Sequence, residues 1–128
     1  MTDREMLELA ARAGGYVVES YIDSGGAWVY PVGEVPNADG DYPGLFLWSP
    51  REGDGDALRL AVQLMIRVSV NRAFRLSIPG SVTVEYPDRD GFYFALGEAV
   101  TNGDPYAATR LAIFRAAAEI GRQMEEQS

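Results

Sequence analysis

Three residue types with reactive side chains are missing from this chain of 128 residues, which contains no cysteine, no histidine and no lysine. The absence of cysteine excludes disulfides, thiolate metal sites and cysteine nucleophiles. The absence of histidine excludes the usual general base near neutral pH, the Ser-His-Asp triad and the commonest transition-metal ligand. The absence of lysine excludes Schiff-base chemistry and the lysine of a phosphate-binding loop. Catalysis would have to use carboxylates, hydroxyls or arginine, and we expect a protein that is not an enzyme and uses no cofactor.

The chain also lacks an apolar run of the roughly 18 residues that are needed to cross a bilayer. Its first residues, MTDREMLELAARAG, carry charge where a signal peptide needs an apolar core. We therefore expect a cytoplasmic protein that begins at its mature N-terminus. With 47% hydrophobic and 23% charged residues the composition is typical of globular proteins, and the length predicts one domain over residues 1–128.

Basic residues are scarce, and the formal net charge is -8. A nucleic-acid or anionic-membrane partner requires a basic patch, whereas the arginines are scattered along the chain, so neither partner is expected. An acidic surface suits a basic protein partner. The alternative interpretation is that the charge serves only solubility.

The N-terminal segment has the pattern of a capped helix. Thr2 and Glu5 have the spacing of a capping box, and Gly14-Gly15 is a typical helix end. One helical face would carry Met6, Leu9, Ala10 and Ala13. Two β-rich runs follow at 16–22 and 27–32, with a glycine-rich turn between them, and predict a hairpin.

Residues 33–44 contain clustered turn formers without periodicity and predict a surface loop, after which the apolar run 45–48 returns to the core. A second helix is predicted over 57–67, with an inner face formed by Leu58, Ala61, Leu64 and Met65. Alternating segments at 68–78, 82–86 and 92–100 then predict three antiparallel strands, joined by turns at Pro79-Gly80 and 87–91.

The last element is predicted to be a helix that begins with Asp104 as N-cap and Pro105 at the first helical position. Its inner stripe would be formed by Ile113, Phe114, Ala117, Ala118, Ile120 and Met124. Its outer side would carry the charged residues Arg115, Glu119, Arg122 and Glu126. Together these elements predict an α+β fold, with an antiparallel sheet of about three to five strands packed with N-terminal, central and C-terminal helices.

The stretch WSPREGDGDALRLAV, residues 48–62, concentrates the candidate ligands of the chain. As a metal loop, its carboxylates could supply oxygen ligands to Ca²⁺ or Mg²⁺ together with acids of the preceding loop. The spacing does not fit an EF-hand, because a loop that starts at Asn37 would place Tyr42 where glycine is required and Trp48 where glutamate is required. The candidate binding residues are Asp39, Asp41, Trp48, Glu52, Asp54 and Asp56.

The start of a helix explains the same stretch better. Ser49 and Glu52 have capping-box spacing with Pro50 at the first helical position, and Asp54 offers a second cap. The acids would lie at the positive end of the helix dipole. A phosphate loop is excluded, since the glycines alternate with acids and the motif's lysine is missing. A paired-carboxylate enzyme is the third alternative, and nothing in the spacing favours it.

Two motifs of the chain resemble a group of small tailed-phage and prophage proteins. In that group a Trp-Asn-Pro turn leads into an acidic stretch and Gly-Asp-Ala-Leu-Arg-Leu-Ala-Val, and the chain closes on a helix that ends Ala-Ala-Glu-Ile-Gly. The matching positions are Trp48, Pro50, 55–62 and 108–121, with departures at Ser49 and Leu111. The chain is more loosely similar to the phage ABA sandwich domain family. The resemblance implies a phage or prophage origin and action inside a bacterial host, and it transfers no catalytic or binding residue.

These observations predict a phage accessory protein that binds a host or phage protein without chemistry of its own. A narrower hypothesis is that it inhibits a host defence factor through its acidic surface. The alternative is a small-ligand or divalent-metal-binding domain that uses the acidic 37–56 region. A homodimer, through an exposed strand edge or the alanine-rich last helix, is left open by the pattern.

Overall fold

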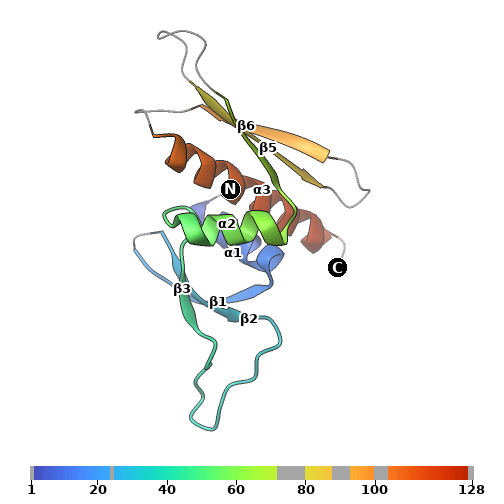
Figure 1. Cartoon of the computed structure of the whole chain (residues 1–128). Helices are drawn as coiled ribbons and strands as arrows, with labels where there is room; N and C mark the ends of the chain where they lie inside the picture. The colour runs from blue at the N-terminus through green and yellow to red at the C-terminus, as the bar shows by residue number, and fades with distance from the viewer. Residues whose placement is uncertain (1, 24, 72–79, 88–92, 100–103, 127–128) are drawn as a thin grey trace.

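The computed structural model of the chain describes residues 2–23, 25–71, 80–87, 93–99 and 104–126 (Figure 1). In chain order the elements are α1 (Asp3–Gly14), β1 (Tyr16–Tyr21), β2 (Ala27–Pro31), β3 (Phe46–Trp48), α2 (Asp54–Gln63), β4 (Arg67–Asn71), β5 (Ser81–Pro87), β6 (Tyr93–Ala99) and α3 (Pro105–Glu126). Helices and antiparallel strands are combined as expected, which confirms the α+β class.

The strands form two antiparallel sheets with the orders β1-β2-β3 and β4-β5-β6. The expected hairpin is β1–β2, and the expected meander is β4-β5-β6. Each sheet has three strands, within the expected range, but the strands divide between two sheets where the sequence pattern suggested one. The predicted strand residues 72–78 and most of the two predicted turns, at Pro79-Gly80 and 87–91, lie outside the described residues.

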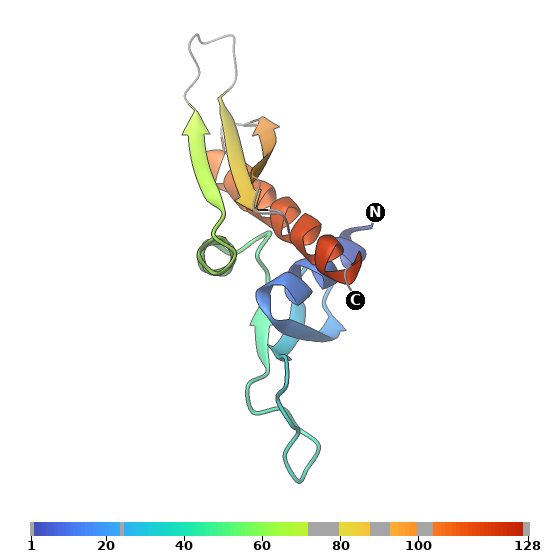
Figure 2. The ribbon, with the colours of Figure 1, turned by 90° about the vertical axis from the view of Figure 1, so that its right-hand side faces the viewer.

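The two sheets lie on opposite sides of a helical layer, as Figures 1 and 2 show. α1 packs on β1 of the first sheet, and α3 packs on β5 and β6 of the second. The two helices pack against each other, and α2 contacts α3 at the side. The order through the molecule is therefore first sheet, α1, α3, second sheet.

α3 is buried on more than one side, because it contacts α1, α2 and the second sheet. Its buried residues are Ala108, Ala112, Ile113, Phe114, Ala116, Ala117, Ala118 and Gly121. Small side chains let the neighbouring helix and strands approach closely. The expected cap is present, since the Asp104 side chain accepts from the backbone N–H groups of Tyr106 and Ala107 at 3.1 Å. The predicted inner position of Met124 is wrong, because its side chain is exposed.

The capping box of α1 is confirmed. The Thr2 hydroxyl accepts from the Glu5 backbone N–H at 3.1 Å, and Glu5 accepts from the Thr2 backbone N–H in return. The helix ends at Gly15, whose φ of 84° is in the left-handed region. Leu7, Ala10 and Ala11 are buried, so the inner face is rotated from the predicted one, of which only Ala10 is fully buried.

α2 begins three residues earlier and ends four residues earlier than predicted, and it turns a different face inward. It spans Asp54–Gln63 and buries Ala57, Leu60 and Ala61. Leu58 and Met65 were predicted to face the core, and both are exposed. The prediction was wrong because two stripes of this segment carry apolar residues, and periodicity alone does not say which of them meets α3.

The inner face of the first sheet is aromatic. Trp48 is buried and lies 5.6 Å from the Tyr16 ring, which packs edge-on against Phe46 at 5.3 Å. These aromatic contacts close the core beneath α1. Among the described residues, no helix is long and apolar enough to cross a membrane.

Candidate functional site

Asp39 and Asp41 lie in the long loop between β2 and β3, which projects from the lower end of the molecule in Figure 1. The Asn37 side-chain oxygen accepts from the backbone N–H groups of both acids at 3.0 Å. The Asn37 backbone N–H donates to the Asp41 carbonyl at 2.8 Å. Asn37 thus closes a tight turn, and both carboxylates are on exposed residues of it.

The acids of the 48–62 stretch hold the start of α2 in place. Asp56 accepts from the backbone N–H of Ser49 at 2.9 Å and pairs with Arg59 at 3.2 Å. Asp54 pairs at 2.6 Å with Arg110 of α3. Glu52 is exposed. Arg110 also donates to the Arg51 carbonyl at 3.0 Å, so it joins α3 to the turn before α2.

The prediction that this stretch starts a helix is correct, but its caps are wrong. The N-cap of α2 is Gly53, and no side chain caps it. The Ser49 carbonyl accepts from the N–H groups of Glu52 and Gly53, which makes a separate turn before the helix. Ser49 therefore caps nothing, because the chain turns once more before α2 begins.

The six candidate binding residues are not gathered at one place. Asp39 and Asp41 lie in the projecting loop, whereas Asp54 and Asp56 lie at the start of α2 on the other side of β3. Trp48 is 2% exposed and belongs to the core. In the part of the chain that the structure describes, no three carboxylates are grouped so that they could hold a metal ion.

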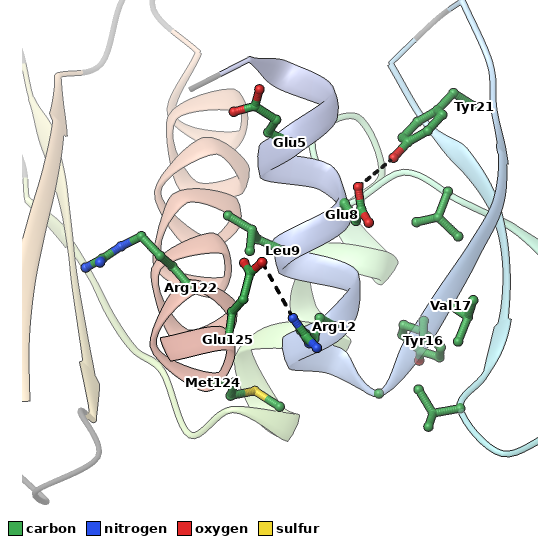
Figure 3. A pocket seen from close by; sticks show the side chains of 13 residues that line it. Glu5, Glu8, Leu9, Arg12, Tyr16, Val17, Tyr21, Arg122, Met124 and Glu125 are labelled. Atoms are coloured by element: carbon green, nitrogen blue, oxygen red, sulfur yellow. Dashed lines mark hydrogen bonds and ion pairs between the residues drawn. The ribbon is translucent and has the colours of Figure 1, made fainter. Parts of the chain in front are cut away.

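An open groove of about 1000 Å³ lies between α1, β1 and the C-terminal end of α3 (Figure 3). Two pairs of its side chains face one another across the elements. Tyr21 donates to Glu8 at 3.3 Å, and Arg12 lies 4.0 Å from Glu125. Burial and the adjacent Glu8 carboxylate raise the pKa of Tyr21. These contacts join α1 to β1 and to α3, so the groove is primarily a structural junction.

The outer face of the first sheet carries a different kind of surface, which we call the aromatic face and define as Trp28, Tyr30, Tyr42 and Leu47. Trp28 and Leu47 are directly paired across β2 and β3, and their side chains are 39% and 48% exposed. Tyr30 follows Trp28 two residues along β2 and therefore shares its face. The Tyr42 ring stacks on the Tyr30 ring with centroids 3.8 Å apart and planes inclined by 9°.

Two carboxylates, those of Glu19 and Glu34, lie near Tyr30 of this face. A hydrogen bond with Tyr42, burial and the nearby Glu19 and Glu34 raise the pKa of Tyr30. One oxygen of Glu34 accepts from the Gly44 backbone N–H at 2.9 Å. Its other oxygen, Oε2, is buried and has no hydrogen-bond partner among the described residues. A desolvated carboxylate oxygen of this kind is stabilised by a donor, most strongly by a cationic one.

The sequence interpretation did not select the aromatic face. A signal was present, because Trp28 and Tyr30 alternate with Ala27 and Val29, which are both fully buried. Once the small residues are assigned to the core, the aromatic residues must point outward. The contribution of Tyr42 comes from the 33–44 loop folding back onto β2, and spacing along the chain does not encode that contact.

Comparisons of the chain with protein-family models, curated proteins and solved structures found no match.

Proposed function

We propose that the chain is a non-catalytic protein-binding module that acts on a host or phage protein in the bacterial cytoplasm. The phage or prophage origin in this proposal is taken from the resemblance of the 48–62 and 108–121 motifs. The observation that carries the binding role is the aromatic face on the outside of the first sheet. A basic protein surface, and neither nucleic acid nor a membrane, is the proposed partner.

Side-chain chemistry favours a protein partner for this face. Trp and Tyr dominate the residues whose truncation weakens protein interfaces most, since they bury large rigid surfaces and keep a polar group. Trp28 and Leu47 form one apolar unit, and the Tyr30–Tyr42 stack extends it. An exposed apolar row on the solvent side of a small sheet is typical of an interaction site.

The surrounding charge specifies the kind of partner. Glu19 and Glu34 lie close enough to Tyr30 to raise its pKa, so they border the aromatic face. An arginine or lysine of the partner could lay its aliphatic part on the tyrosine rings with its charge near the Glu19 and Glu34 carboxylates. This chemistry is compatible with the narrower hypothesis of a host defence factor as the target, because nucleic-acid-binding enzymes expose basic surfaces.

The test is affinity capture from a lysate of the natural host with the native chain and with Trp28→Ala. Tyr106→Ala is the matched control, because Tyr106 is a 69% exposed aromatic residue of α3, remote from the aromatic face. We expect one dominant host or phage protein, retained by the control and weakened about 30-fold or more by Trp28→Ala in a titration of the purified pair. The native interaction should also weaken as the salt concentration rises.

Equal binding by the native chain and Trp28→Ala would refute the role of the aromatic face. Recovery of no protein by the native chain would refute the binding role itself. The small-ligand or divalent-metal alternative would then come first, although no contact between Asp39 or Asp41 and the start of α2 supports it.

A further inference from the structure

A second exposed apolar surface lies on α2 and the turn after it. Leu58, Val62 and Met65 are 63%, 71% and 71% exposed. Leu58 and Val62 are four residues apart on α2 and share one stripe, and Met65 follows in the turn after the helix. A different side of α2 is buried, with Ala57, Leu60 and Ala61. The stripe therefore faces away from the core of the molecule.

β4 continues this surface. In the strand order β4-β5-β6 it is an edge strand, and all five of its residues are exposed. Val68 and Val70 are the partners of the buried Val84 and Val82, so they point to the side of the sheet that α3 covers. They remain 39% and 57% exposed at this margin. Figure 2 shows β4 and α2, seen end-on, at the same side of the molecule.

The charge of this surface differs from that of the rest of the chain. Residues 57–71, which form this surface, contain no acidic residue and two of the eleven arginines, Arg59 and Arg67. All nineteen acidic residues are in the rest of the chain, with nine arginines. Two copies of so acidic a protein repel each other over most of their surface. The surface made by α2 after its first turn and by β4 therefore lets two copies approach with few carboxylates facing each other, since Asp54 and Asp56 lie in the first turn of α2 and Glu85 is paired with Arg67.

Met65 gives an independent indication that this surface is covered. After α2 the N–H of Ile66 donates to the Ala61 carbonyl, and the N–H of Met65 donates to the Val62 carbonyl, which is a Schellman motif. Met65 occupies its left-handed position with φ of 55°, where glycine or asparagine is favoured. Because the Met65 side chain is largely exposed, packing within one copy does not explain why this strained position holds methionine.

We propose that two copies of the chain form a twofold-symmetric dimer in which their β4 strands pair antiparallel about Ser69. In this register Val68 of one copy meets Val70 of the other, and Arg67 meets Asn71, so no like charges are opposed. The pairing converts the two second sheets into one six-stranded sheet and satisfies the exposed backbone of each edge. The α2 stripes cover the junction from each copy. Because these residues are separate from the aromatic face, the dimer does not depend on the proposed function.

Cross-linking tests the register directly, because the native chain has no cysteine. Ser69→Cys brings two thiols together at the symmetry axis and should form a covalent dimer under mild oxidation. Ser20→Cys, exposed on β1 of the first sheet, is the matched control and should form little. The double variant Trp28→Ala, Ser69→Cys should cross-link as well as Ser69→Cys alone, because Trp28 lies outside the proposed dimer interface.

Light scattering at protein concentrations up to about 100 μM measures the mass of the native chain in solution. We expect the mass of a dimer, because at this concentration most of the protein is dimeric even if the Kd is about 10 μM. Val70→Lys, which places a charge at the edge, and Met65→Gly should each weaken the dimer at least tenfold. At a concentration below the Kd of the native dimer, where both proteins are monomeric, Met65→Gly should not lower the melting temperature, which separates lost association from lost folding. A native monomer would overturn the proposal. So would a dimer that both variants retain and that Ser69→Cys does not cross-link.

Discussion

Replacement of Gly121 by alanine tests the packing of the helical layer. A Cβ atom at this position of α3 would lie 1.9 Å from the Leu9 carbonyl oxygen and 2.6 Å from its carbon. Both are backbone atoms of α1, so no side-chain rotation can relieve the contact. Alanine is favoured over glycine in a helix by about 1 kcal/mol, whereas forced overpacking costs roughly 1–3 kcal/mol or more. Because the contact is with a rigid backbone, the unfavourable contribution should exceed the favourable one.

We expect Gly121→Ala to lose about 2 kcal/mol or more, which for a chain of this size lowers the melting temperature by roughly 8 °C. The measurement is urea and thermal unfolding followed by circular dichroism. Gly55→Ala is the matched control, since Gly55 is a helical glycine of α2 whose Cβ would meet nothing closer than the Arg59 guanidinium at 4.0 Å. The control should be as stable as the native chain or more stable. A Gly121→Ala variant of native or higher stability would refute the close α1–α3 approach.

Three further outcomes follow from the contacts described above. Arg110→Met removes the ion pair and the carbonyl hydrogen bond at the start of α2, and should lower the free energy of unfolding by about 1–2 kcal/mol in urea denaturation; an unchanged midpoint would contradict that role. Tyr42→Phe removes the hydrogen bond that most strongly raises the pKa of Tyr30, so tyrosinate absorbance should rise at lower pH in the variant. In the native chain the raised pKa of Tyr30 gives stability that is complete below about pH 10 and is lost as the pH rises through the folded-state value. Finally, Ca²⁺ or Mg²⁺ should leave the melting temperature unchanged; an increase that disappears in an Asp39→Asn, Asp41→Asn variant would restore the metal-binding alternative.

Local signals in the sequence predicted much of the architecture. The Thr2 capping box, Asp104 before Pro105 and the alternation of Val82, Val84 and Tyr86 each specify backbone geometry within a few residues. The helices, the hairpin and the meander could therefore be assigned from spacing alone. Which face each helix buries could not be assigned, because that depends on the neighbouring element.

The candidate site shows the same division between local and distant information. The acids of the 48–62 stretch attracted attention by their density, yet Asp54 is engaged by Arg110, which is 56 residues away in the chain. The aromatic face combines Trp28 of β2 with Leu47 of β3, and pairing across the sheet brings them together. A segment rich in acidic residues is thus a weaker indication of a site than the positions of small residues in a strand. The small residues show which side of the strand is buried and therefore which side chains point outward.

The order of layers places the aromatic face and the β4 edge at opposite ends of the molecule. A dimer joined through β4 would hold its two aromatic faces at the far ends of an elongated particle, both accessible at once. Such a particle is divalent, so a partner that displays repeated copies of one epitope would be held by avidity, with gains of about 10² to 10⁴ over a single contact. Binding to a partner with a single epitope would gain nothing from the second aromatic face. The dimer would therefore select its targets by the number of epitopes they display as well as by their chemistry.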